Sequence, residues 1–129
     1  MFPIIARWTI LEGKEVEAVA ALKELAASVE EAEPDTWMYT IHTPDLTQNN
    51  LPSPPPNEVI FFSVFADADA FQKHLDGPLF GQWAAKYLDL FLTNWDHLFV
   101  LAEYLDRQTG FVRQQMVTAD PPPAGPPSS

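Results

Sequence analysis

The chain has 129 residues, of which 47% are apolar and 12% aromatic, and it carries a net charge of −11 with no cysteine. This length suits one domain, and the missing cysteines exclude disulfides, a thiol nucleophile and thiolate metal sites. The seven Lys and Arg residues form no basic stripe, which argues against nucleic acid and anionic membranes as partners. No run approaches the ~18 consecutive apolar residues of a membrane helix, and the N-terminal stretch lacks the basic region of a signal peptide. We therefore expect a cytoplasmic protein.

The first two predicted elements are a strand and a helix. Residues 3–11 (PIIARWTIL) are rich in isoleucine, tryptophan and threonine, a composition typical of a strand. From residue 15 to residue 33 the apolar spacing becomes helical. Apolar side chains recur there at intervals of three and four, namely Val19, Leu22, Ala26 and Val29. Pro34 then ends an amphipathic helix that must lie on an apolar surface.

A second strand and a long loop are predicted next. In residues 36–43 (TWMYTIHT) the alternation puts Trp37, Tyr39 and Ile41 on one face. The following residues, 44–57, are rich in proline and asparagine. They predict a long loop without regular structure, and such loops are usually functional or disordered.

The strand expected at residues 58–66 is apolar on both faces. Its alternation separates Val59, Phe61, Ser63 and Phe65 from Ile60, Phe62 and Val64. Asp67 is suited to cap a short helix at residues 68–76. A further helix is expected at 79–91 and a fourth strand at 97–105.

The order of these elements predicts an α+β protein with a ferredoxin-like βαββαβ fold and an antiparallel sheet in residues 1–106. Helices of this topology cover one sheet face, so the strand at 58–66, apolar on both sides, predicts a homodimer with the sheets face to face. Residues 107–118 are expected to hold an extra strand, at 111–117, that could cross to the partner. Residues 119–129 are expected to form a disordered proline-rich tail.

Residues 61–80 (FFSVFADADAFQKHLDGPLF) resemble the antibiotic biosynthesis monooxygenase (ABM) family, in which an apolar strand, an acidic turn and a histidine-bearing helix follow one another. The matching positions are Ala70, His74, Leu75, Pro78 and Phe80. Residues 37–43 (WMYTIHT) are similar to a family strand with a central tyrosine. The resemblance covers residues 3–105. It implies a dimeric ferredoxin-like α/β-barrel with a pocket, between the sheet and the helices, for an apolar and often polycyclic aromatic molecule.

The resemblance also implies a chemistry. Some ABM members oxygenate anthrone-like substrates, and others act on quinols, without metal, haem or flavin, because the substrate anion itself passes an electron to dioxygen. Phe65, Phe61 and Ser63 stand where such relatives carry tryptophan, asparagine and glutamate. We expect a cofactor-independent monooxygenase acting on a hydrophobic aromatic substrate of anthrone or quinol type. The alternatives are a cyclase, isomerase or decarboxylase, and a non-catalytic dimeric ligand-binding protein.

Four side chains are candidates for catalysis. His74, on the inner side of the short helix, would move the proton, because imidazole ordinarily titrates near pH ~6.5; a partly buried structural histidine is the alternative. His42, at the end of its strand beside the long loop, could serve instead. Tyr39 or Arg7 would stabilise the resulting oxyanion, although an ion pair between Arg7 and Glu103 is the other interpretation of that arginine.

Aromatic residues are the candidates for substrate binding, and core packing is the alternative for each of them. They are Trp37, Phe61, Phe62, Phe65, Phe71 and Trp83. No two of the three histidines have the local spacing of metal ligands, so we expect neither a metal nor another cofactor.

Overall fold

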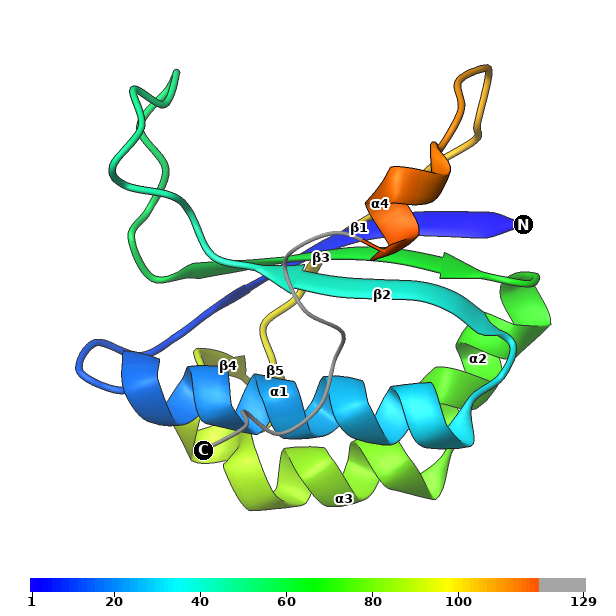
Figure 1. The fold of residues 1–129 in the computed structure, drawn as a ribbon. Coiled ribbons are helices and arrows are strands. Elements are labelled where there is room, and N and C mark those ends of the chain that lie inside the picture. The colour runs from blue at the N-terminus through cyan, green and yellow to red at the C-terminus, as the bar shows by residue number, and fades with distance from the viewer. Residues whose placement is uncertain (119–129) are drawn as a thin grey trace.

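The computed structural model describes residues 1–118, and the tail predicted at 119–129 lies outside the described residues. The described part contains a four-stranded antiparallel sheet with the strand order β2-β3-β1-β6 and with helices packed on one face (Figure 1). The strands of this sheet are β1 (Phe2–Thr9), β2 (Thr36–His42), β3 (Glu58–Phe65) and β6 (Leu101–Tyr104). The predicted α+β ferredoxin-like fold is thereby confirmed.

Three helices follow the sequence pattern closely. They are α1 (Glu15–Ala32), α2 (Ala68–Asp76) and α3 (Pro78–Tyr87), the last continued by the 3-10 turn η1 (Leu88–Leu90). The predicted helix at 79–91 therefore ends its α-helical part four residues early. Asp67 caps α2 as expected, since its Oδ1 accepts a hydrogen bond from the Ala70 N–H at 2.8 Å.

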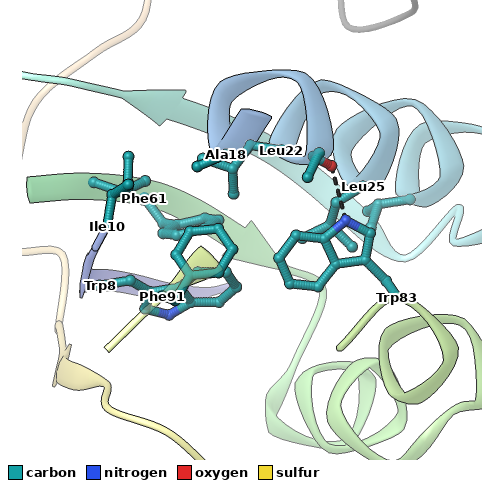
Figure 2. Packing of buried hydrophobic residues seen from close by; sticks show 11 residues of the cluster. Trp8, Ile10, Ala18, Leu22, Leu25, Phe61, Trp83 and Phe91 are labelled. Atoms are coloured by element: carbon teal, nitrogen blue, oxygen red, sulfur yellow. Dashed lines mark hydrogen bonds between the residues drawn. The ribbon is translucent and has the colours of Figure 1, made fainter. Parts of the chain in front are cut away.

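The helices α1 and α3 lie along the same face of the sheet and enclose an aromatic core (Figures 1 and 2). Trp8 of β1 contacts three buried rings, with centroid distances of 4.4 Å to Phe61, 5.6 Å to Trp83 and 5.5 Å to Phe91. The Trp83 indole N–H donates to the Ala21 carbonyl at 2.8 Å, so its polar atom is satisfied inside the core. Side chains thus occupy the space where the family resemblance implied a pocket.

The fourth strand differs from the prediction. Instead of one strand at 97–105, the chain forms a short hairpin, β4 (Thr93–Asn94) with β5 (His97–Leu98), and only then the sheet strand β6. Trp95 and Asp96 connect the hairpin with φ values of 55° and 65°. Positive φ at both positions is the geometry of a type I′ turn, and a Trp-Asp pair lacks the Asn-Gly or Asp-Gly pattern that predicts such a turn.

The strand predicted at 111–117 is wrong for the described chain. The short helix α4 (Gln114–Thr118) stands there, and residues 111–117 are exposed. Glutamine and methionine favour a helix over a strand.

The second face of the sheet carries no helix from α1 to α3. It presents Pro3, Ile5, Arg7, Met38, His42, Ile60, Phe62, Val64 and Leu101. The loop after β2 and the segment after β6 with α4 both extend on this side (Figure 1). We call this surface the open face.

Candidate active site around His74

The sheet separates the four candidate catalytic residues into two pairs. Tyr39 and His74 lie on the helix side, where their rings are 5.5 Å apart. Arg7 and His42 lie on the open face, opposite Leu101 and Ile60 in the strand register. The four side chains therefore cannot act together on one substrate within a single chain.

His74 is the most enclosed of the candidates, with 5% of its surface exposed. Aromatic rings from β2, β3 and α3 surround its imidazole, at centroid distances of 5.5 Å to Tyr39, 5.4 Å to Phe65 and 5.6 Å to Phe80. His74 lies on α2, and the cap at Asp67 fixes the first turn of this helix and so helps to position the imidazole. The predicted inward orientation of His74 is confirmed.

Glu33 is a member of this site that the sequence analysis missed. It stands just after the last residue of α1, and its Oε1 lies 2.7 Å from His74 Nδ1. The same oxygen accepts a hydrogen bond from the Thr36 hydroxyl at 3.2 Å. A carboxylate at a helix C-terminus opposes the helix dipole, and this unfavourable placement is the sequence signal that could have drawn attention to it.

Tyr39 is held neutral in this site. Burial raises the pKa of its hydroxyl above the ordinary value, and the negative charge of Glu33 raises it further. Across the register from Tyr39 lies Ser63 of β3, which is also buried. Tyr39 can therefore donate a hydrogen bond to a developing oxyanion but does not itself act as a base near neutral pH.

The open face holds the other two candidates in polar contacts of their own. Arg7 pairs with Glu103 at 3.2 Å and with Glu58 at 3.8 Å, so the predicted ion pair with Glu103 is confirmed. His42 Nε2 lies 3.0 Å from the Thr40 hydroxyl, and its ring lies 4.8 Å from that of Phe62. The residues Arg7, His42 and Phe62 thus share the open face.

The remaining aromatic candidates for substrate binding do not gather at one place. Phe61, Phe65 and Trp83 are buried in the core. Phe71 packs near the end of the sheet, 5.1 Å from Phe65. Trp37 is 61% exposed, because a register shift between Thr36 and Met38 interrupts the alternation that would have placed it beside Tyr39.

A hollow of about 430 Å³ lies between α3 and the β4–β5 hairpin. Its lining is mostly apolar, with Asp96 and His97 as the polar members; the other lining residues are Leu75, Phe80, Gly81, Ala84, Ala85, Leu88 and Leu98. Phe80 lines the hollow and also contacts His74. The Phe80 ring therefore lies at both the hollow and the surroundings of the imidazole.

No helix within residues 1–118 combines the length and apolar character needed to cross a membrane. In the same range, no three His, Cys, Asp or Glu side chains gather in a way that could hold a metal ion.

Comparison with known proteins gives one family. The family model described as antibiotic biosynthesis monooxygenase matches residues 1–86. A comparison with curated proteins finds no match to the chain.

Several solved structures with provisional antibiotic biosynthesis monooxygenase names have a similar fold. One from Deinococcus radiodurans has a TM-score of 0.64 at 15% identity and covers 88% of this chain and 100% of its own. One from Caulobacter crescentus has a TM-score of 0.66 at 20% identity and covers 84% and 90%. A third, from Nitrosomonas europaea, has a TM-score of 0.66 at 10% identity and covers 84% and 100%. At these identities the likeness concerns the fold.

Proposed function

Because the chain belongs to the antibiotic biosynthesis monooxygenase family, we propose that it is a cofactor-independent monooxygenase acting on a hydrophobic aromatic substrate of anthrone or quinol type. In the anthrone case a ring methylene becomes a carbonyl. One atom of dioxygen enters the product, and the other leaves with the two methylene hydrogens as water. The substrate supplies the electrons, so the reaction balances without a further reductant.

The observation that carries this proposal is the buried His74 imidazole among three aromatic rings, beside the neutral hydroxyl of Tyr39. The imidazole takes the proton from the acidic C–H or O–H of the substrate. Tyr39 donates a hydrogen bond to the oxyanion that results. Phe80 lines the apolar hollow beside α3 and also contacts the imidazole, so its ring offers a flat apolar surface against which the substrate rings can lie.

The test is oxygen uptake with a panel of anthrones and quinols, with product quantified. Changing His74→Gln should lower kcat about 100-fold or more, as expected for loss of a general base. Lys73→Gln is the control, because Lys73 is the exposed neighbour of His74 on α2. Turnover that survives His74→Gln unchanged would contradict the assignment of the base.

A second candidate function is ligand binding without turnover. The packed interior favours it, because Trp8, Phe61, Trp83 and Phe91 fill the core. The apolar hollow between α3 and the β4–β5 hairpin is then the place where an aromatic compound would bind. An aromatic compound recovered unchanged from the purified protein would support this function. Conversion without oxygen uptake would instead support the cyclase, isomerase or decarboxylase alternative.

We also propose that the protein is a homodimer that pairs through the open face. Phe62 lies on this face with 41% of its surface exposed, next to other apolar side chains such as Ile5 and Val64. The loop after β2 and the segment with α4 extend on the same side of the sheet in Figure 1, where they would contact a second copy of the chain. Burial of this apolar surface supplies the driving force.

A further inference from the structure

We propose that Glu33 is a positioning residue that holds the neutral His74 imidazole in the Nδ1–H tautomer and so makes Nε2 the proton-accepting atom. The identity of the base rests on the proposed function, but the tautomer does not. Nothing in the sequence pattern connects these two residues, which lie 41 positions apart.

The contact between the two side chains determines which nitrogen carries the hydrogen. Glu33 Oε1 and His74 Nδ1 are 2.7 Å apart, a distance typical of a charge-assisted hydrogen bond. An ionised carboxylate can only accept hydrogen bonds, so Nδ1 must be the donor. In the neutral ring the lone pair therefore resides on Nε2.

The second nitrogen is available to a substrate. Within residues 1–118 the His74 ring makes its hydrogen bond to Glu33 through Nδ1, and Nε2 makes none. No fully buried side-chain nitrogen or oxygen of those residues lacks a hydrogen-bond partner. Nε2 is therefore not completely enclosed. The imidazole as a whole remains largely covered, with 5% of the residue exposed, which limits competition from water.

The carboxylate is itself held in place. Thr36, the first residue of β2, donates its hydroxyl hydrogen to the same Oε1 at 3.2 Å, and its backbone N–H donates to the Glu33 carbonyl at 3.0 Å. The turn between α1 and β2 thus fixes Glu33 at the place where α2 positions His74. A histidine oriented by a carboxylate that is oriented in turn is the arrangement by which enzymes select one basic nitrogen.

The test is ¹⁵N NMR of the His74 ring at a pH where the imidazole is neutral. The Nδ1–H tautomer should dominate in the wild type. In Glu33→Gln, which preserves the size of the side chain, the amide can donate to Nδ1, and we expect the tautomer ratio to shift at least about tenfold toward Nε2–H. Glu31→Gln makes the same chemical change at an exposed position of α1 and should leave the ratio unchanged.

The outcomes separate this inference from the proposed function. A wild-type ring in the Nε2–H form, or a ratio unaffected by Glu33→Gln, overturns the role of Glu33 whether or not the protein turns over a substrate. If turnover is found, Glu33→Gln should lower kcat about 100-fold with little change in KM, because a base in the wrong tautomer still binds substrate. A rise in KM with kcat unchanged would contradict the positioning role, because Glu33 would then contribute to binding and not to proton transfer.

Discussion

At the scale of single residues, the site combines groups that restrain one another. Glu33 attracts the Nδ1 hydrogen of His74, and its charge also opposes ionisation of Tyr39. The phenol is thereby kept as a hydrogen-bond donor while the imidazole is oriented as an acceptor. Two groups with different proton roles, set apart by their surroundings, are the usual basis of acid–base chemistry near neutral pH.

Tyr39→Phe should change how the free energy of unfolding depends on alkaline pH. The hydroxyl pKa is raised in the folded protein above the ordinary value of about 10. Below pH ~10 the Tyr39 hydroxyl is protonated in both the folded and the unfolded state, so it does not make the free energy of unfolding depend on pH. Above pH ~10 the unfolded chain releases this proton while the folded chain retains it, so the free energy of unfolding falls as pH rises. Without this hydroxyl the fall between about pH 10 and 11.5 should be shallower by about 1 kcal/mol per pH unit.

Urea unfolding followed by tryptophan fluorescence at several pH values measures this slope. Tyr104→Phe is the matched control, because Tyr104 is largely exposed at the end of β6. Parallel stability curves for the wild type and Tyr39→Phe would show that Tyr39 is not held neutral by the fold.

At the scale of secondary-structure elements, α2 and α3 are joined by a corner that positions His74 and Phe80. Gly77 separates the two helices, and Pro78 begins the second at the position where its missing N–H costs least. A Cβ on Gly77 would lie 2.8 Å from the Lys73 carbonyl oxygen. The chain can therefore turn this tightly only with glycine, and the tight turn keeps Phe80 against the imidazole.

The two glycines of this region should respond oppositely to alanine. Gly81 lies inside α3, and no heavy atom of residues 1–118 outside its own helix turn comes within 4 Å of the place where a Cβ would stand. Gly81→Ala should therefore raise the free energy of unfolding by about 0.5–1 kcal/mol through helix propensity. Gly77→Ala should lower it by about 1 kcal/mol or more, because the added methyl group overlaps backbone. Chemical denaturation of both variants provides the comparison, and equal effects would contradict the geometry of the corner.

At the scale of the whole molecule, one face of the sheet is covered and the other is not. The helices cover the side of Phe61 and Phe65, whereas Ile60, Phe62 and Val64 alternate onto the open face. Arg7 sits among these apolar residues and is neutralised by two carboxylates, so the face can be buried without an unpaired cation.

Phe62→Asp should dissociate the proposed dimer. In a two-fold interface every substitution occurs twice, and each copy would place an unpaired charge on an apolar surface. We expect the Kd for self-association to rise at least about 100-fold, equivalent to roughly 3 kcal/mol. Sedimentation velocity measures it, with Val16→Asp as the control, since Val16 is 82% exposed on the outer side of α1. A wild-type protein that is monomeric at micromolar concentration would refute the dimer itself.

Much of the fold could be predicted from local patterns. The sequence predicts the apolar spacing of α1, the alternation in β2 and β3, and the cap at Asp67. Each can be predicted because the residues that determine it are neighbours along the chain. The buried face of α1 is nonetheless rotated slightly from the predicted one, since Ala18 and Ala21 are buried and Val19 is not among the buried residues. Such small rotations depend on which side chains the sheet offers, and helical periodicity does not contain that information.

The candidate site could be predicted only in part. His74 and Tyr39 were identified, and so was the ion pair of Arg7 with Glu103, because strand order brings the first and last strands together. The register shift that turns Trp37 outward was not foreseen, because a bulge depends on pairing with a neighbouring strand.

The sequence by itself determined the order of the main strands and helices, the alternation of side chains between the two faces of β3 and the inward position of His74, since these follow from chain periodicity and local capping. Only the tertiary structure decided that Arg7 and His42 lie across the sheet from His74, that aromatic rings occupy the space beneath the helices, and that Glu33 meets the imidazole. These are contacts between residues distant in the chain. Their geometry is set by how the end of α1, the start of β2 and the corner between α2 and α3 pack together, and no single segment encodes it.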